Sequence, residues 1–325
     1  MFHSKLHFKG SRVRSIPGFA RHRWTSRAQA TNTPPEHNDE GDISMRHGRQ
    51  AGALARMGFA AALVGLGLAL STPAVARECG NGAAGFGSWL SAFKKRAAAE
   101  GVSQRAIAQG LDGIAYDPRI IRLDRNQKSF KLSFEQFYAR RVGTALIGRA
   151  RARLRTHAAT FDRMERQFGV PREIVVAIWG LETNFGADTS GKYSIIRSLA
   201  TLAYDCRRSP FFTGQLVDAL RIVDHGDMSP ADMRGGWAGE IGQTQFLPTP
   251  YVKYGVDFDG NGRVDLVRSV PDILASTANF LKGHGWQRGQ PWHPGSPNYD
   301  VIRDWNRAQV YQRTISVMAS KLAAR

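Results

Sequence analysis

Apolar residues recur every three to four positions along most of the chain from Phe86 onward, and this spacing predicts helices. The alternation with a period of two that marks strands is scarce, and no internal repeat is visible. The pattern predicts one mainly α domain of roughly 230 residues, which is long enough to bury a sizeable core. We expect helices over residues 86–101, 104–111, 134–169, 171–186, 272–283 and 305–323, a helix pair over 198–223 that breaks near 205–210, and a linker over 285–299.

The helix over 171–186 has a carboxylate on its apolar side. Pro171 suits the first turn, where its missing N–H is no loss. Ile174, Ile178 and Glu182 follow at i, i+4 and i+8, so Glu182 shares a face with two expected core residues. A carboxyl group removed from water favours its protonated form and can act as a general acid near neutral pH. The alternative is that Glu182 lies at the helix edge in a surface ion pair, or that the helix ends before it.

An apolar stretch near the N-terminus has the pattern of an export signal. Residues 46–56 contain three arginines, residues 57–70 are a 14-residue apolar run, and Ala74-x-Ala76 follows as a cleavage pattern. Fourteen residues are few for crossing a bilayer, and no Leu-x-x-Cys lipobox lies at the cleavage point. We expect residues 45–76 to be a signal peptide and the compartment to be the periplasm. Residues 1–44 are then an extra segment, either disordered or not translated if Met45 is the initiator.

The chain is strongly basic, with 45 Lys and Arg against 27 Asp and Glu. Residues 77–325 keep 35 of the basic and 23 of the acidic residues, a net charge of +12. This charge predicts attraction to a polyanion, whether a cell-wall polymer, a membrane surface or nucleic acid. Export argues against nucleic acid, and no nucleic-acid-binding pattern of interleaved aromatic and basic residues is present. A merely soluble basic surface is the alternative.

Cys79 and Cys206 are the only cysteines, and both follow the expected cleavage site. In an oxidising compartment such a pair can form one disulfide, and we expect the two to be joined. Neither has a Cys-x-x-Cys or His-rich neighbourhood, which argues against a redox or zinc role. The alternative is two separate thiols.

Residues 235–251, GGWAGEIGQTQFLPTPY, combine glycine with aromatic and amide side chains, notably Trp237, Gln243, Gln245 and Phe246. Glycine lets a backbone approach a ligand closely, and amide groups supply paired donors and acceptors for sugar hydroxyls. The stretch therefore predicts a binding loop for a carbohydrate. A tight irregular turn around a buried Trp237 is the alternative.

Residues 257–265, DFDGNGRVD, have the first half of an EF-hand calcium loop. Oxygen-bearing side chains alternate and a glycine occupies position six, but position twelve is Arg268 where the usual bidentate Glu belongs. Asp272 is the nearest later carboxylate. An Asx-turn loop that needs no metal is the alternative.

Four motifs occur in an order that resembles the lytic murein transglycosylase B family, glycoside hydrolase family 103. They are GLETNFG (180–186), the loop 235–251, DFDGNGRVD (257–265) and NFLKGHGW (279–286), and the similarity extends from about Phe86 to the C-terminus. The resemblance implies a mainly α, lysozyme-like fold of the goose-type or lytic transglycosylase kind, with an EF-hand-like calcium loop and residues 77–325 as its catalytic domain. It also implies cleavage of the MurNAc–GlcNAc β-1,4 bond of peptidoglycan with formation of 1,6-anhydroMurNAc ends.

The resemblance assigns roles to individual residues. Glu182 is the single catalytic acid and base. The implied glycan contacts are Tyr138, Gln245, Phe280, Trp305, Asn306 and Tyr311, and the implied calcium ligands are Asp257, Asp259, Asn261, the Arg263 carbonyl and Asp272. The chain departs from the family pattern at Gly236, where relatives have a small hydroxyl residue, at Phe280, which lacks an aromatic hydroxyl, at Trp305, where relatives can have Tyr, and at Glu240, an extra carboxylate.

A single acid suits an anhydro product, because the muramoyl C6 hydroxyl then attacks in place of water. Glycosidases that use water usually employ two carboxyl groups. Glu240, Asp188 and Asp205 are the residues that could instead make the protein a hydrolytic muramidase. A non-catalytic peptidoglycan-binding protein is a third alternative. We expect a monomer whose partners are glycan strands.

Overall fold

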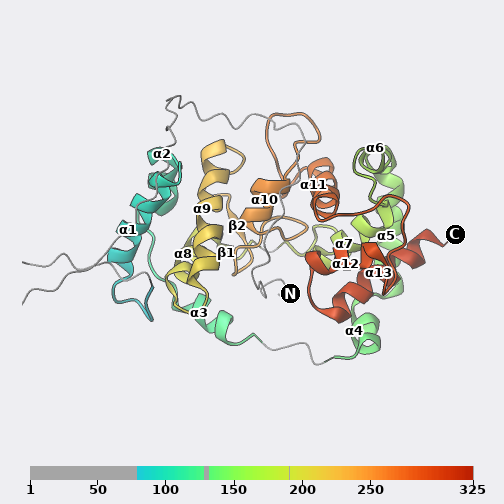
Figure 1. The fold of residues 1–325 in the computed structure, drawn as a ribbon, viewed down its shortest axis with the longest axis horizontal. Helices are drawn as coiled ribbons and strands as arrows, with labels where there is room; N and C mark the ends of the chain where they lie inside the picture. The colour runs from blue at the N-terminus through green and yellow to red at the C-terminus, as the bar shows by residue number, and fades with distance from the viewer. Residues whose placement is uncertain (1–78, 128–131, 190, 325) are drawn as a thin grey trace, which may run out of the picture. The chain divides into compact units, whose positions relative to one another are not determined.

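The computed structural model describes residues 79–127, 132–189 and 191–324, which belong to one structural unit. The expected extra segment 1–44 and signal peptide 45–76 lie outside the described residues. Helices dominate, as the periodicity predicts, and a short two-stranded antiparallel sheet pairs Tyr193 with Gly235 and Ser194 with Arg234 (Figure 1). The elements are α1 (Phe86–Ala99), α2 (Gln104–Leu111), α3 (Pro118–Arg125), α4 (Phe134–Arg141), α5 (Thr144–Thr156), α6 (Ala158–Phe168), α7 (Arg172–Thr183), β1 (Tyr193–Ser194), α8 (Ile195–Tyr204), α9 (Ser209–His225), β2 (Arg234–Gly235), α10 (Pro248–Tyr254), α11 (Val270–Gly283), α12 (Pro297–Trp305) and α13 (Gln309–Ala323).

Two expected helix starts are confirmed by their caps. The Ser103 hydroxyl accepts the Ala106 N–H at 3.1 Å at the start of α2. Ser133 and Gln136 form a reciprocal capping box at the start of α4. Each cap satisfies backbone N–H groups that have no partner inside the helix.

The single helix expected over residues 134–169 is wrong, because the run is three helices, α4, α5 and α6. The breaks fall at Val142–Gly143, which leave helical geometry, and at His157, which separates α5 from α6. Each piece packs on a different partner, α4 on α13, α5 on α7 and α6 on α11. One straight amphipathic helix could not reach all three. The expected outer position of the α5 arginines is confirmed, since Arg149, Arg151, Arg153 and Arg155 are exposed.

Three short helices were not predicted, namely α3, α10 and α12. Each begins with a proline in its first turn, which is a common start signal for a helix. The apolar pattern that follows each of these prolines is too short to predict a helix. Helix α12 occupies the end of the expected linker 285–299, and Trp305 closes α12 instead of opening the last helix. The expected break within 198–223 is confirmed, because α8 ends at Tyr204 and α9 begins at Ser209.

Helix α7 lies at the centre of the part of the domain that also holds α5, α6, α11 and α13 (Figure 1). Ile174 and Ile178 are fully buried, and Trp179 is 1% exposed. A helix that is apolar nearly all round can be stable only inside a core. None of the described helices combines the length and apolar composition that crossing a membrane requires.

Gln243 connects α7 to two loops. Its Oε1 accepts the indole N–H of Trp179 at 2.8 Å, and its Nε2 donates to the Val267 carbonyl at 2.8 Å. Its backbone carbonyl accepts the Thr183 hydroxyl at 2.5 Å, and its backbone N–H donates to Leu266 at 2.9 Å. The loop 235–251, the segment after residue 265 and the last turn of α7 therefore meet at the backbone and side chain of one residue, Gln243.

The expected disulfide is confirmed. Cys79 and Cys206 are bonded, with their Cα atoms 5.0 Å apart across 127 positions of sequence. Next to it, the Gly80 N–H donates to the Tyr204 carbonyl at 2.8 Å. These contacts hold residues 79 and 80 against the segment that connects α8 and α9.

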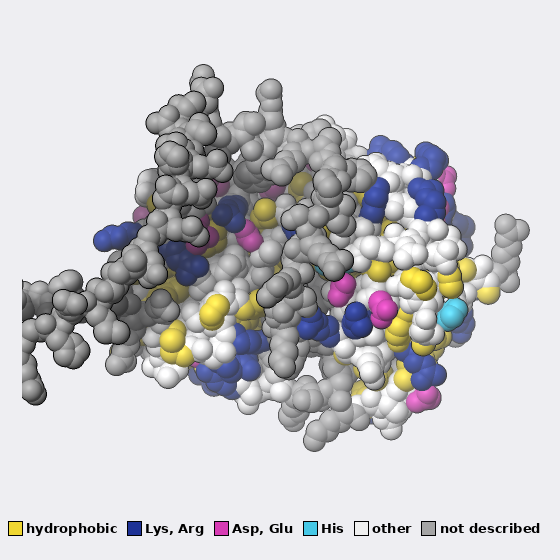
Figure 2. Space-filling view, viewed as in Figure 1, with side chains coloured by type: hydrophobic (Ala, Val, Ile, Leu, Met, Phe, Trp, Pro, Cys, Tyr) yellow, Lys and Arg dark blue, Asp and Glu magenta, His cyan; other side chains and the backbone are white. Residues whose placement is uncertain are grey.

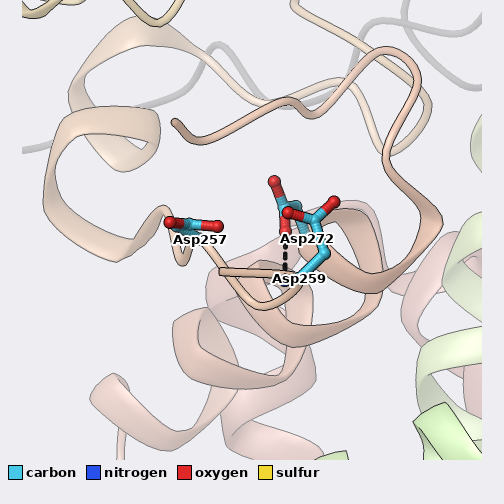
Figure 3. A group of neighbouring side chains, drawn as sticks. All are labelled: Asp257, Asp259 and Asp272. Carbon is cyan, nitrogen blue, oxygen red and sulfur yellow. Dashed lines mark hydrogen bonds between the residues drawn. The ribbon is translucent and has the colours of Figure 1, made fainter. Parts of the chain in front are cut away.

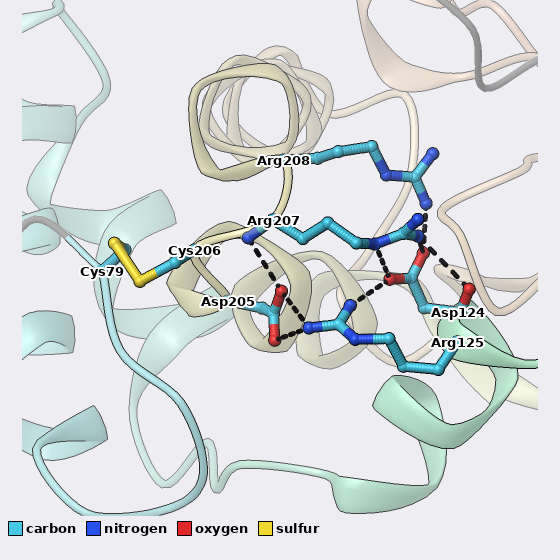
Figure 4. Close-up of polar contacts among 7 residues, drawn as sticks. All are labelled: Cys79, Asp124, Arg125, Asp205, Cys206, Arg207 and Arg208. Carbon is cyan, nitrogen blue, oxygen red and sulfur yellow. Dashed lines mark hydrogen bonds and ion pairs between the residues drawn. A yellow bond between two sulfur atoms is a disulfide. The ribbon is translucent and has the colours of Figure 1, made fainter.

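Two buried carboxylates, those of Asp124 and Asp205, form ion pairs with partly exposed arginines beside this disulfide (Figure 4). Arg125 bonds both carboxylate oxygens of Asp205 at 2.8 Å and Asp124 at 2.7 Å. Asp124, 2% exposed, also accepts hydrogen bonds from Arg207 and Arg208. Buried carboxylates require such compensation, because an unpaired buried charge is strongly destabilising.

Basic side chains are abundant on the surface. In Figure 2, Lys and Arg side chains gather over the region that α6 occupies in Figure 1. This distribution fits the positive net charge of the sequence.

Replacing both cysteines with serine should lower stability, because the disulfide restricts a long loop in the unfolded chain. The chain-entropy treatment gives roughly 4–5 kcal/mol as an upper value for a loop of this length. Urea unfolding of the C79S/C206S variant measures the loss. An unfolding midpoint equal to that of the wild type, or two free thiols titrated in the denatured, unreduced wild type, would contradict the bridge.

Gln243→Leu should destabilise the protein by about 2–3 kcal/mol, because it leaves the buried Trp179 N–H and the Val267 carbonyl without partners. Gln109→Leu, which changes an exposed glutamine of α2, is the matched control and should shift stability by less than about 0.5 kcal/mol. Urea midpoints measure both variants. Equal shifts in the two would show that Gln243 does not link these segments.

Candidate active site around Glu182

Glu182 lies in the last turn of α7 and is half-buried. Helix α7 extends through Thr183, so the expectation that it includes Glu182 is confirmed. The chain then turns sharply, with positive φ at both Asn184 and Phe185. Positive φ is strained for residues with side chains and is often found at functional sites.

The indole N–H of Trp305 donates to Glu182 Oε1 at 2.9 Å. Trp305 ends α12 and is 3% exposed, so this hydrogen bond fixes the carboxyl group against a buried ring. The bond spans 123 positions of sequence. The structure thus brings together two residues that the family resemblance had named separately.

The buried phenol of Tyr311, on α13, is close enough to Glu182 to be affected by its charge. Burial first, and then the nearby charge of Glu182, raise the pKa of the Tyr311 phenol well above its usual value. The phenol therefore keeps its proton in the working pH range. Arg141 of α4 opposes this shift, and its guanidinium donates to the Leu181 carbonyl one residue before Glu182. Nothing in the sequence pattern around Arg141 pointed to this position.

An aromatic cluster packs behind Glu182. The ring of Trp305 meets Phe246 at 5.5 Å and Phe280 at 5.1 Å between centroids, both edge to face. Such edge-to-face pairs add to the stabilisation from burial. Phe280 is 9% exposed and also stacks on His284 at 4.0 Å, so its ring contacts mainly other rings of the protein. The cluster forms a rigid wall for the site.

The other residues expected to contact a glycan differ in burial and in the groups that they contact. Gln245, in the loop 235–251, has φ +55° and donates from Nε2 to the Gly242 carbonyl at 2.8 Å. Asn306 is 2% exposed, and its Oδ1 accepts the Ala308 N–H at 3.0 Å, which orders the turn between α12 and α13. Tyr138 is half-buried against Phe134, and desolvation raises the pKa of its phenol. Their roles toward a glycan stay predictions.

The three carboxylates that could serve as a second catalytic group either make other contacts in the protein or are exposed. Glu240 is 3% exposed, and its Oε2 accepts the Ala238 N–H at 3.1 Å inside its own loop. A Cβ atom at Gly236 would lie 2.1 Å from that same oxygen, so a side chain at position 236 would require the Glu240 carboxyl group to move. The two departures from the family pattern are therefore in direct contact. Asp205 is held by Arg125, and Asp188 is exposed.

The expected calcium loop gathers three carboxylates. Oxygens of Asp257, Asp259 and Asp272 lie within 4.8 Å of one another (Figure 3). Asp272 is fully buried, and burial raises the pKa of its carboxyl even though it accepts N–H groups from Phe258 and Asp265. Among the described residues, no Lys or Arg forms an ion pair with these three aspartates. A cation would relieve their mutual repulsion.

The rest of the loop is a series of turns ordered by side-chain oxygens. Asp257 accepts the N–H groups of Gly260 and Gly262 at 2.8 Å, and both glycines have positive φ. The Asn261 Oδ1 accepts the Arg263 N–H at 3.1 Å. Arg268, at position twelve, pairs with Asp265 at 2.9 Å. The donor set of aspartates and carbonyl oxygens fits calcium, which prefers oxygen ligands.

The chain matches the family model for the transglycosylase SLT domain over residues 85–296. It is 38% identical over 145 residues to the membrane-bound lytic murein transglycosylase B of Escherichia coli strain K12. That alignment covers 42% of this chain and 40% of the relative, so the chain spans about two fifths of the length of the relative it matches.

Solved structures show the same fold. SltB3 from Pseudomonas aeruginosa, in complexes with NAG-NAM-pentapeptide and with NAG-anhNAM-pentapeptide, matches with a TM-score of 0.69. It is 31% and 30% identical in the two complexes, over 74% of this chain and 80% of SltB3. The Escherichia coli lytic transglycosylase Slt35 in complex with calcium matches with a TM-score of 0.64 at 22% identity, over 72% of this chain and 92% of Slt35. The mainly α, lytic transglycosylase fold implied by the sequence is therefore confirmed, and the chain belongs to the transglycosylase SLT domain family.

Proposed function

We propose that this protein is a peptidoglycan lytic transglycosylase that cleaves the MurNAc–GlcNAc β-1,4 bond and leaves 1,6-anhydroMurNAc ends. The observation that carries the proposal is Glu182, held by the Trp305 N–H at the end of a buried helix. The family membership and the SltB3 complexes with NAG-NAM and NAG-anhNAM ligands support this substrate and product.

In this mechanism Glu182 first acts as an acid. It gives its proton to the glycosidic oxygen as the bond from that oxygen to C1 of MurNAc breaks. The N-acetyl group of the same sugar stabilises the resulting cation. The positions of Glu240, Asp205 and Asp188 support a mechanism with one protein carboxyl group, since the first two are engaged in other contacts and the third is exposed.

Glu182 then acts as a base. It takes the proton of the muramoyl C6 hydroxyl while the C6 oxygen bonds to C1, which closes the anhydro ring and restores the acid. The Trp305 hydrogen bond keeps the carboxyl group in one orientation for both transfers, and such preorganisation is a large part of catalysis. The proposed glycan contacts are Tyr138, Gln245, Phe280, Trp305, Asn306 and Tyr311.

Calcium has a structural role in this proposal. Asp257, Asp259, Asn261, the Arg263 carbonyl and Asp272 would hold it. The loop they form continues to Leu266 and Val267, which bond to Gln243. The ion would therefore stabilise the loop that supports the end of α7. We further propose that the mature protein is a periplasmic monomer acting on glycan strands.

Glu182→Gln should fold normally and lose activity by about 10³-fold, because it keeps the side-chain shape and removes the transferable proton. Reducing-end analysis of digested sacculi measures the product, which should be anhydro ends for the wild type. Glu240→Gln is the matched control and should keep most of the activity, since an amide oxygen can still accept the Ala238 N–H. Substantial activity in Glu182→Gln would move the acid to another residue, and hydrolytic ends from the wild type would mean a muramidase.

Calcium should raise the melting temperature. With no glutamate at position twelve, we expect a Kd on the order of 10⁻⁴ M, so 10 mM calcium should add about 2.7 kcal/mol of stability. Asp257→Asn should abolish the gain, and Asp304→Asn, an exposed residue of α12, should keep it. Melting curves with calcium, magnesium or a chelator test this. Identical curves in calcium and chelator would rule the site out.

A further inference from the structure

A basic pocket lies apart from the residues around Glu182. It has a volume of about 150 Å³ and forms where the β1–β2 sheet meets the N-terminal ends of α3 and α8. Its lining contains four basic residues and one acid, with three polar neighbours: Arg119, Lys192, Arg197, Arg234, Asp117, Tyr193, Ser194 and Ser198. We propose that this pocket binds a carboxylate of the peptide stem on the bound glycan strand, an inference that rests on the proposed function.

Two of the arginines are fixed by neutral partners. The Arg197 guanidinium donates to the Ala115 carbonyl at 2.9 Å and the Tyr116 carbonyl at 3.4 Å. Arg234 donates to the Gly191 carbonyl at 2.9 Å and the Lys192 carbonyl at 3.1 Å. Carbonyl oxygens orient a guanidinium without neutralising it, and each guanidinium has five N–H donors. Both groups therefore keep charge and donors for an anion.

The single acid of the pocket compensates only part of this charge. Asp117 is 4% exposed and binds Arg119 through both of its oxygens, at 3.0 and 2.8 Å. Arg197 lies farther from it, at 3.9 Å. No hydrogen bond or ion pair from the Lys192 ammonium reaches another described residue. Lys192 and Arg234 thus remain without an acidic partner within the described part of the chain.

The N-terminal end of α8 adds to the positive potential, because its cap residue Ser194 lines the pocket. At the start of α3 the carboxylate of Asp117 already accepts the Arg119 N–H at 3.0 Å, so that helix end is neutralised within the protein. The N-terminus of a helix favours a negative group, and here it acts together with four basic side chains. A carboxylate is small enough for the volume and can accept bonds from arginine and lysine at once.

The position of the pocket favours the peptide stem as its ligand. Arg234 pairs with Ser194 in the β1–β2 sheet and is followed directly by the loop 235–251, whose Phe246 packs against Trp305 in the site. A GlcNAc–MurNAc strand carries its acidic groups on its peptides, because the sugar hydroxyls and acetamides are neutral. The related SltB3 was solved with NAG-NAM-pentapeptide, a ligand of this kind.

The test compares two substrates with one variant. K192Q/R234Q removes the two cations that lack an acidic partner, and activity is measured on peptide-bearing glycan strands and on the same strands after an amidase has removed the peptides. The amidase leaves a lactyl carboxylate on each MurNAc, so the bare strands lack the peptide carboxylates but keep this acid next to the sugar ring. We expect KM on peptide-bearing strands to rise roughly tenfold with little change in kcat, and activity on bare strands to match the wild type. The control K95Q/R151Q removes the same charge from exposed positions on α1 and α5 and should behave as the wild type on both substrates.

Because Arg234 also anchors two carbonyl groups, Lys192→Gln is measured alone as a variant that leaves those bonds intact, and it should raise KM on peptide-bearing strands about threefold. Equal loss on both substrates, an unchanged KM in both variants, or the same loss in K95Q/R151Q would overturn the proposal. If the pocket instead bound a phosphate of another polymer, the substitutions would leave KM unchanged on both peptide-bearing and bare strands. A wild type inactive on both substrates would instead overturn the proposed function.

Discussion

The side chain of Gln243 is the contact on which the rest of the site depends. One amide binds the indole of Trp179 inside α7 and the carbonyl of Val267, while the adjoining carbonyl takes the hydroxyl of Thr183. Thr183 is the residue directly after Glu182. The geometry of the catalytic candidate is therefore set by a loop that lies 60 positions further along the chain. Because Trp179 and Thr183 are buried, their polar groups have to be satisfied by protein, and Gln243 satisfies both of them.

The same arrangement connects the calcium loop to the site. Three aspartates meet at one end of that loop, and Leu266 and Val267 at its other end bond to Gln243. Repulsion among the aspartates works against this arrangement, and a bound cation would remove it. An ion with no part in the chemistry would thereby help to hold the last turn of α7. This support for α7 is a physical reason for a calcium loop to occur together with an active site that uses a single acid.

Charge is balanced differently in different parts of the molecule. Around Asp124 and Asp205, partly exposed arginines neutralise buried carboxylates beside the disulfide. In the pocket at the β1–β2 sheet, Arg197 and Arg234 are fixed mainly by carbonyl oxygens and keep their charge. The first arrangement stabilises the fold, whereas the second leaves donors available to a ligand. Net charge alone does not distinguish the two.

The sequence by itself determined the features that depend on residues close together in the chain. The apolar period gave α1 and α7, the serine caps placed the starts of α2 and α4, and the order of motifs indicated the family, the calcium loop and Glu182. The pairing of the only two cysteines also followed from the sequence. Tertiary structure decided the break of residues 134–169 into three helices, the helix α12, and the internal roles of Gln243, Phe280 and Asn306. Helical period and capping act within a few residues, whereas burial and pairing across 60 to 123 positions are set only when distant segments pack together.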